Sequence, residues 1–180
     1  MVTAVSAGET RAPLDDFDAL VTAHWPGIFR FALVSLRDTD AAATVAQDCF
    51  THAWRSRERF RGDASVRTWL MQIAVNLVRD AARSRRLQFW RRAQETIPEM
   101  ADGRLSPEAD AASKERLQAV WRVVRKLPER QRTVFLLRFV EEMELLEIAG
   151  ATGMAEGTVK AQLFRALRAV REAVGNKTYE

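Results

Sequence analysis

The sequence has few of the residues and motifs from which enzymes are usually built. Among its 180 residues there is one cysteine, Cys49, so no disulfide can form within the chain, as is typical of proteins in reducing compartments. The two histidines, His24 and His52, belong to no recognisable ligand or triad motif, and there is no glycine-rich phosphate loop. We therefore predict a protein that is not an enzyme, with no catalytic residue, metal, cofactor or small-molecule substrate.

Signals for export or membrane insertion are also missing. The N-terminal residues lack the charged and then apolar order of a signal peptide. No window reaches the roughly 18 uninterrupted apolar residues of a membrane span. These observations predict a cytoplasmic protein without direct membrane insertion.

Period-two alternation is missing as well, so no strand is predicted and the expected fold class is all-α. Apolar residues recur at helical spacing in most of the chain. The first domain, residues 10–92, is expected to contain helices at 14–24, 25–37, 38–60 and 65–86, with a turn at 61–65. Asp38, Thr39 or Asp40 would cap the third of these helices, Ser65 the fourth, and Pro26 would lie in the first turn of the second.

A second small helical domain is predicted at 114–176. Its helices are expected to begin near Ser106 and Pro107 and at Pro128, and to be followed by a short helix at 144–152, a turn at Gly153 and a long helix at 156–172. Residues 93–113 contain one arginine and five acidic residues, together with Pro98, Gly103 and Pro107, and predict an acidic linker. Basic domains flank it, with 14 Lys and Arg against 10 Asp and Glu before it and 13 against 9 after it.

The end of the second domain has the layout of a helix-turn-helix. Ile148 and Ala149 would pack against Val159 and Leu163, which fixes the angle between the two helices. The first turns of the second helix could then enter a major groove. The residues predicted to contact the duplex are Thr158, Lys160, Ala161, Gln162, Phe164, Arg165 and Arg168.

Arginines and aromatic residues are interleaved in the first domain. Arg79, Arg83, Arg85, Arg86, Arg91 and Arg92 fall within a short segment and are opposed there only by Asp80. Such a density of one charge is favourable when a polyanion neutralises it, and aromatic residues beside a basic groove suit single-stranded nucleic acid. Trp54 and Trp69 have the spacing of core residues. Asn76, inside the apolar run "IAVNLV", must be either exposed or hydrogen-bonded, because an unpaired buried amide is costly.

These segments together resemble bacterial RNA polymerase sigma factors of the extracytoplasmic-function (ECF) group. "AQDCFTHAWR" resembles the helix that docks on polymerase, and "FRGDASVRTWLMQIAVN" the promoter-melting segment. The stretch from Leu127 to Glu172 resembles region 4. A hydroxyl residue that commonly caps the third region-4 helix is replaced here by Glu144, whose charge would still favour a helix N-terminus.

The resemblance implies that the chain binds core RNA polymerase, through its β′ and β subunits, and promoter DNA, and that an anti-sigma factor controls it. Region 2 would dock through Gln47, Asp48, Phe50 and Trp54. The duplex-binding residues above would read the minus-35 element. The minus-10 element would be recognised and opened by Phe60, Arg61, Asp63, Ser65, Arg67, Asn76, Arg79 and Arg83. The acidic linker would pass through polymerase channels shaped for nucleic acid.

One alternative stays open from the residues alone. A helix-turn-helix transcriptional activator that is not a polymerase subunit would end in a similar domain. It would normally carry a receiver or ligand-binding domain with strands, and the first 92 residues predict none. Binding assays distinguish the two, because an activator binds DNA by itself whereas a sigma factor requires core polymerase.

Overall fold

In the described part of the chain every regular element is helical. The computed structural model describes residues 16–91 and 111–175, and within these ranges it contains no strand. The elements are α2 (Phe17–Leu36), α3 (Thr39–Ser56), the 3₁₀ helix η1 (Arg57–Arg59), α4 (Val66–Arg91), α5 (Ala111–Val124), α6 (Glu129–Phe139), α7 (Leu145–Thr152) and α8 (Glu156–Gly175). The all-α prediction is confirmed.

Side-chain caps fix where the helices of the first unit begin. Asp16 accepts a hydrogen bond from the Ala19 amide at 3.0 Å and starts α2. Asp38 accepts one from the Ala41 amide at 2.8 Å and starts α3, and Ser65 accepts one from the Thr68 amide at 3.1 Å at the start of α4. Each bond satisfies an amide that has no partner within its helix. Of the three residues predicted as the α3 cap, Asp38 therefore has this role.

One helix prediction is wrong, because α2 is continuous through Pro26, where a break and a restart were expected. Proline removes one backbone hydrogen bond inside a helix. Helix residues on both sides of it, among them Leu20, Ile28 and Phe31, are buried in the same core, and this packing outweighs the local loss.

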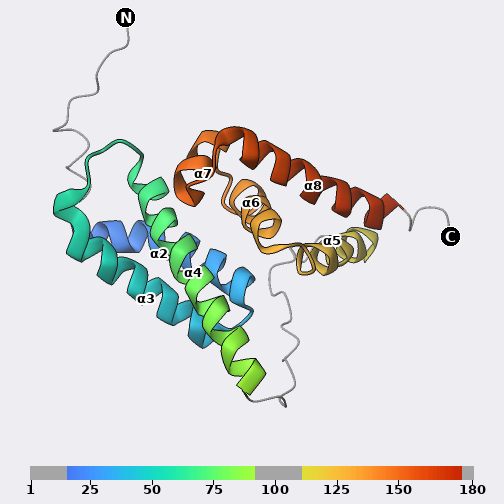
Figure 1. Ribbon diagram of the computed structural model, residues 1–180, viewed down its shortest axis with the longest axis horizontal. Coiled ribbons are helices and arrows are strands. Elements are labelled where there is room, and N and C mark those ends of the chain that lie inside the picture. Colours follow the sequence, from blue (N-terminus) through green and yellow to red (C-terminus); the bar gives the residue numbers. More distant parts are fainter. Residues whose placement is uncertain (1–15, 92–110, 176–180) are drawn as a thin grey trace, which may run out of the picture.

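Helix α2 has the length and composition of a membrane-spanning helix, with a mean hydropathy of 1.3 in its most apolar window. In the structure it packs along α3 and α4 (Figure 1). Arg30, near its middle, is paired with a carboxylate of the second unit. We therefore describe α2 as a core helix.

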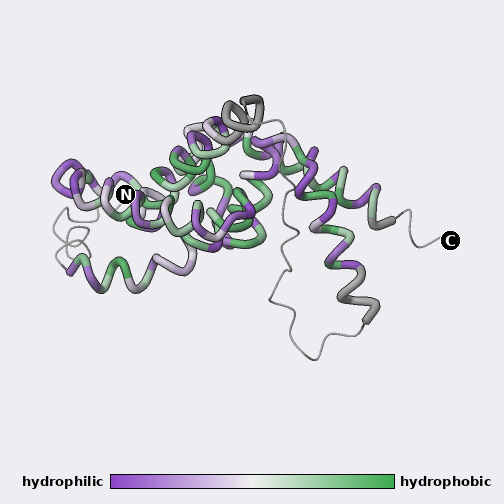
Figure 2. The backbone as a smooth tube through the Cα atoms, turned by 90° about the horizontal axis from the view of Figure 1, so that it is seen from below, coloured by the Kyte–Doolittle hydropathy of each residue, from purple (hydrophilic) through white to green (hydrophobic). Residues whose placement is uncertain are grey.

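The helices form two units, α2–α4 and α5–α8, that lie against each other. In the second unit α5 and α6 pack on α8, and α7 connects this group to α4 (Figure 1). Apolar residues gather where the helices face one another, and hydrophilic residues lie outside (Figure 2). One cluster of buried side chains runs through both units, including Leu70 and Met71 of α4 and Ile148 and Val159 of the helix-turn-helix.

The predicted linker lies largely outside the described residues, which end at 91 and resume at 111. Three residues assigned to it, 111–113, belong to α5. The predicted cap Ser106 and Pro107 also lie outside the described residues.

Candidate nucleic-acid and polymerase interfaces

The α7–turn–α8 segment has helix-turn-helix geometry. Gly153 ends α7 with a φ of 69°, a left-handed conformation that glycine adopts without strain, and its amide bonds the Ala149 carbonyl at 2.9 Å. Ile148 and Val159 are fully buried against each other's helices, as predicted. At the start of α7 the backbone amide of Glu144 donates to the Glu147 carboxylate at 2.8 Å, so a carboxylate caps this end in place of a hydroxyl.

One face of α8 is open to solvent and carries most of the predicted duplex-binding residues. Ala161, Arg165 and Arg168 are exposed and recur at helical spacing, and Phe164 is 65% exposed. Thr158 and Gln162 are partly buried. The opposite face is buried at Val159 and Ala166. This arrangement can present the amide of Gln162 and the guanidinium groups of Arg165 and Arg168 to a major groove of DNA.

Two of the basic residues on α8 have acidic neighbours on the same helix. Lys160 Nζ lies 2.7 Å from Glu156, and Arg168 Nε lies 3.5 Å from Glu172. Exposed pairs of this kind contribute little to stability, roughly 0.3–0.5 kcal/mol. Both cations can therefore exchange these partners for phosphates at small cost.

Leu146 of α7 is a surface residue that the sequence analysis did not identify. Its side chain is 73% exposed, more than any other large apolar residue described. Its neighbours Leu145 and Ile148 pack in the core, and the alternation of buried and exposed leucines was a signal that could have identified it. Leu146 and Phe164, which is 65% exposed, are the two large apolar side chains described as exposed on α7 and α8.

The 60–65 loop projects from the end of the first unit. Gly62 adopts a φ of 77°, which reverses the chain there, and Arg61, Asp63 and Ser65 are exposed. Phe60 packs on Trp69 with ring centroids 4.9 Å apart. The structure therefore places an aromatic pair at the base of a polar loop.

A groove between the end of α3 and the start of α4 lies beside this aromatic pair. Its volume is about 420 Å³, and it is lined by His52, Arg55, Ser56, Arg59, Trp69 and Ile73. None of these was among the predicted site residues. The arginines at every second position from 55 to 61 could have indicated this basic groove in the sequence. The groove combines an aromatic wall with cations, which suits single-stranded nucleic acid.

Asn76 is exposed on α4, which resolves the two alternatives left by the sequence. Its Oδ1 accepts a long hydrogen bond of 3.4 Å from Arg79. Since it follows Trp69 and Ile73 at helical spacing, it continues the stripe of α4 that lines the groove. Arg83, two turns beyond Asn76, is also exposed.

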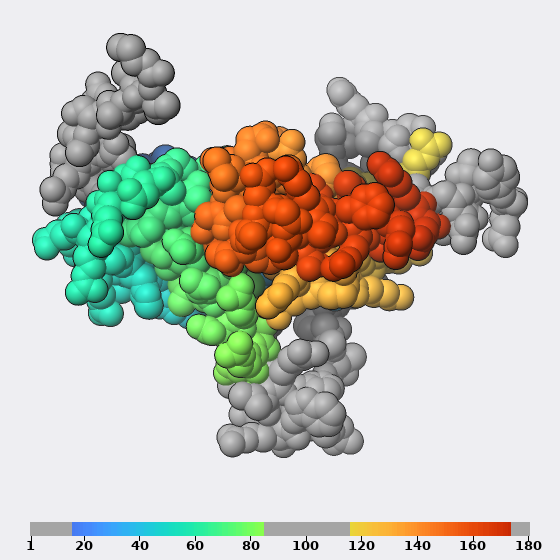
Figure 3. All heavy atoms as spheres, turned by 45° about the horizontal axis from the view of Figure 1, so that its top comes forward, coloured from blue at the N-terminus to red at the C-terminus, as the bar shows by residue number. Residues whose placement is uncertain are grey.

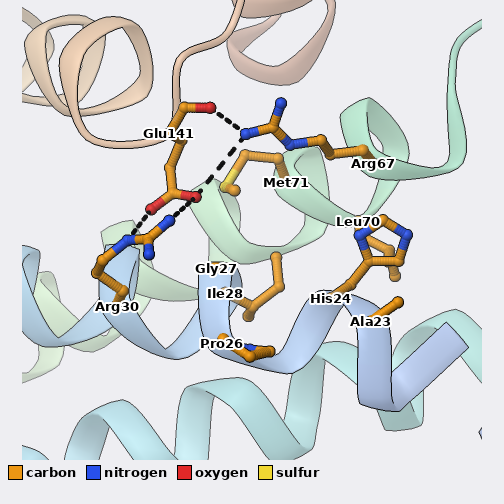
Figure 4. A pocket seen from close by; sticks show the side chains of 10 residues that line it. All are labelled: Ala23, His24, Pro26, Gly27, Ile28, Arg30, Arg67, Leu70, Met71 and Glu141. Carbon is orange, nitrogen blue, oxygen red and sulfur yellow. Dashed lines mark hydrogen bonds and ion pairs between the residues drawn. The ribbon is translucent and has the colours of Figure 1, made fainter.

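Two residues of the minus-10 set, Arg67 and Arg79, contact the second unit, and Arg79 Nε lies 3.5 Å from the Glu129 carboxylate of α6. The Arg67 guanidinium donates to the backbone carbonyl of Glu141 and lies 3.9 Å from the Glu141 carboxylate. Arg30 donates to the same carboxylate from Nε at 2.8 Å and from Nη2 at 2.9 Å (Figure 4). The side chains of Glu141, Arg30 and Arg67 border a cavity of about 230 Å³.

Opposing effects act on the ionisation of this cluster. Burial raises the pKa of Glu141, while its hydrogen bonds to Arg30 and the charge of Arg67 act against that rise. The same hydrogen bond raises the pKa of Arg30. With two guanidinium groups facing one carboxylate, the ion pair is the arrangement at neutral pH. His24, in the same cavity, has a pKa lowered by burial and by Arg67, so it is neutral there.

The predicted docking helix α3 presents a polar face with one large aromatic residue. Gln47 and Asp48 are exposed, and Trp54 is 47% exposed, beneath the Arg57 guanidinium at 3.7 Å from its ring. The expectation that Trp54 is a core residue is therefore wrong. Trp69, the other tryptophan expected in the core, is partly buried and packs against the core cluster.

Phe50 does not lie on that docking face. It is 6% exposed and stacks on Trp25 with ring centroids 5.8 Å apart. Its side chain packs α3 against α2, beneath the exposed face that carries Gln47 and Asp48, and is not itself accessible to a partner. A direct contact from Phe50 to polymerase is therefore incompatible with this packing.

Cys49 is fully buried, and its thiol lies 3.4 Å from the Leu70 carbonyl. Burial raises its pKa to about 12, so the reactive thiolate is not populated at neutral pH. It is a core residue, as expected. Among residues 16–91 and 111–175 no three His, Cys, Asp or Glu side chains gather where they could hold a metal.

Comparisons with known proteins identify the family of this chain. The sequence matches the family descriptions Sigma-70 region 2 over residues 20–88 and Sigma-70 region 4 over residues 117–170. It is 32% identical to the RNA polymerase sigma-H factor of Pseudomonas aeruginosa over 97% of this chain and 92% of that protein. Identity to the ECF sigma-E factor of Escherichia coli is 36%, over 74% of this chain and 71% of that one. For ECF sigma factor SigW of Bacillus subtilis it is 29%, with 88% of both chains covered.

Among solved structures, the fold resembles the sigma factor RpoE in its complex with the anti-sigma factor NepR from Bartonella quintana. The TM-score is 0.74 at 22% identity, over 89% of this chain and 97% of that one. CnrH in complex with the cytosolic domain of CnrY gives a TM-score of 0.65 at 23% identity, over 94% and 95% of the two chains. With both sigma-70 regions present in order, and relatives that match along nearly its full length, the chain belongs to the ECF group of RNA polymerase sigma factors.

Proposed function

We propose that the chain directs core RNA polymerase to promoters by dividing recognition between its two helical units. The second unit reads the minus-35 element as duplex, through the exposed face of α8. The first unit docks on polymerase through Gln47, Asp48 and Trp54, and opens the minus-10 element with the 60–65 loop, the groove beside it, and Asn76.

The observation that carries this proposal is the contrast between the two candidate nucleic-acid surfaces. On α8, long and basic side chains lie on the outer face of a helix whose inner face is fixed in the core, which suits a major groove. In the first unit, Trp69 and two arginines line a groove of about 420 Å³, which suits an unstacked base, and Phe60 packs on Trp69. Extruding a base costs a few kcal/mol, and a shaped pocket offsets that cost.

Run-off transcription with purified core polymerase tests the proposal. The chain is added to core enzyme on fragments of its host genome, and the start sites are mapped. We expect new start sites that share upstream elements and that are missing with core alone. Tight binding to promoter duplex by the free chain, with no initiation from core, would support the activator alternative.

We also propose that the chain acts in the cytoplasm, has no catalytic activity of its own, and is held inactive by an anti-sigma factor. The complexes of RpoE with NepR and of CnrH with CnrY support the last point, as does the need to shield two basic surfaces when the factor is idle. Affinity purification from the native host should recover a small acidic or membrane-anchored partner. Recovery of polymerase alone would contradict this part of the proposal.

A further inference from the structure

The cavity between the two helical units has an excess of positive charge in its lining. The units adjoin along α4 and α7 (Figure 3), and the cavity lies beside Glu141. Among the described residues that line it, Glu141 is the one carboxylate, whereas Arg30 and Arg67 supply two guanidinium groups (Figure 4). His24 also lines the cavity and is neutral at neutral pH, because burial and the charge of Arg67 lower its pKa. One positive charge of the lining therefore has no negative counterpart in it.

This excess charge lies at the Arg67 end of the cavity. Arg30 donates to the Glu141 carboxylate from both Nε and Nη2, at 2.8 and 2.9 Å, and the exposed Glu142, outside the lining, also acts on Arg30. Arg67 uses Nη2 alone, for the Glu141 carbonyl and for a 3.9 Å contact to the carboxylate. Its Nε and Nη1 carry three further N–H groups, and these have no acceptor among the described residues. They are available to an anion.

The cavity is open to solutes and suits a small one. The Arg67 side chain is 39% exposed, so a solute can reach it from solvent. Pockets for drug-sized ligands measure about 300–1,000 Å³, whereas a cavity of about 150 Å³ accommodates benzene. A volume of about 230 Å³ is therefore too small for a nucleotide and sufficient for a small organic acid. A Cβ on Gly27 would lie 3.0 Å from Glu141 Oε2, so the missing side chain keeps room beside this carboxylate.

Apolar side chains line the cavity beside the charged end. Ile28, Leu70 and Met71 are each at most 2% exposed and offer carbon atoms for packing. A ligand with one anionic group and a short apolar body would satisfy both parts of the lining. A phosphate dianion has no apolar part, and its second charge would be repelled by Glu141. The lining therefore favours a carboxylate.

We propose that this cavity is a binding site for a small monocarboxylate, with the ligand carboxylate on Arg67 and its carbon chain against Leu70 and Met71. A guanidinium pairs with a carboxylate through two parallel hydrogen bonds, and its fork of N–H groups matches the two oxygens. The inference goes beyond the proposed function and does not depend on it, because binding requires neither polymerase nor DNA.

Propionate is the probe, and the methyl group of Met71 reports its binding to the full chain. The chain is labelled with ¹³C at its methionine methyl groups, and Met71→Leu assigns the Met71 resonance by its loss. At constant ionic strength we expect propionate to shift this resonance saturably and to leave that of Met154, in the helix-turn-helix, unchanged. Propionamide has the same shape without the charge and should bind at least tenfold more weakly, because charge-assisted hydrogen bonds are the stronger ones.

Two variants remove the site by different means. Ala23→Leu fills the cavity from an exposed position in its lining and should weaken propionate binding at least tenfold. Thr22→Leu adds the same side chain one residue earlier, at an exposed position outside the lining, and should leave the affinity unchanged. Arg67→Gln removes the charge and should also weaken binding at least tenfold, whereas Arg122→Gln removes an exposed arginine of α5 and should not. Circular dichroism confirms that each variant keeps its helices.

Thermal unfolding gives a second measurement of the same binding. Saturating propionate should raise the unfolding midpoint of the parent chain and of Thr22→Leu, but not that of Ala23→Leu, since a ligand that binds only the folded chain stabilises it. Several results would overturn the proposal: no saturable shift of Met71 in the parent, equal affinity for propionamide, or unchanged affinity in both Ala23→Leu and Arg67→Gln. Tighter binding of inorganic phosphate than of propionate at the same methyl group would also overturn it, because the ligand class would then be wrong.

Discussion

Replacing Asn76 by alanine should lower the equilibrium constant for promoter opening by about tenfold and leave the affinity for core polymerase unchanged. In the proposed mechanism the Asn76 amide bonds a base that has left the duplex. Losing a hydrogen bond of that kind costs about 1–1.5 kcal/mol. Since about 1.4 kcal/mol corresponds to a factor of ten, the equilibrium between closed and open promoter shifts by that factor.

The structure indicates that this effect can be separated from folding. Asn76 is exposed, and its only described side-chain contact is the 3.4 Å bond from Arg79. Substitutions at such positions usually change stability by less than about 0.5 kcal/mol. Asn76→Asp adds a second test, because it keeps the oxygen that Arg79 bonds, removes the amide donor and brings a negative charge towards the DNA. It should be at least as defective as the alanine variant.

Opening is measured by the fluorescence of 2-aminopurine placed in the minus-10 element, and core binding by anisotropy of labelled chain. Gln118→Ala removes an exposed helical amide of the second unit and serves as the matched control. Equal losses of core binding and of opening would show that Asn76 supports the fold. If both properties are unchanged, Asn76 has no part in base capture.

Three other perturbations test separate surfaces. Arg165→Ala should weaken transcription from promoters that depend on the minus-35 element by roughly fivefold to a hundredfold and leave melting intact, because one good base contact contributes about 1–3 kcal/mol. The control is Arg122→Ala, which removes an exposed arginine of α5. Unchanged promoter choice in Arg165→Ala would remove Arg165 from the reading surface. Trp54→Ala should weaken core binding by about tenfold or more, as loss of a central aromatic contact does, whereas Thr51→Ala on the same helix should not; equal effects would place docking elsewhere. Cys49 should resist iodoacetamide at pH 8 until the chain is unfolded, since burial raises its pKa from 9.0 to about 12. Because the thiol then loses its proton more readily in the unfolded chain, the free energy of unfolding should fall as the pH rises above about 9. Rapid alkylation of the folded chain would contradict this burial.

The features that local chemistry determines could be predicted from sequence. The caps at Asp38 and Ser65 and the left-handed turn at Gly153 follow from residue type, and all three are where they were expected. Pro26 was misjudged because local propensity predicted a break, while burial on both sides of it keeps α2 continuous. The sequence shows which faces are apolar, but not which tertiary contacts will override a local preference.

The surfaces were predicted less well than the helices, because exposure depends on which neighbours cover a residue. Trp54 and Phe50 lie four residues apart on α3, and sequence spacing alone assigns them to the same stripe. In the structure Trp25 stacks on Phe50, whereas Trp54 contacts Phe17 edge-on at 5.0 Å and stays half exposed. The partners come from α2, and the order of residues in α3 contains no information about them.

Glu141 is the clearest case of a role that sequence cannot give. It is followed directly by Glu142, and in "FVEEME" either residue reads as a solvated charge, yet one is buried and the other exposed. Its partners Arg30 and Arg67 come from α2 and α4, which are more than 70 residues away in the sequence. A buried carboxylate is unfavourable unless such partners match its charge, so the tertiary contact decides which of the two glutamates is buried. The residues beside Glu141 contain no information about that contact.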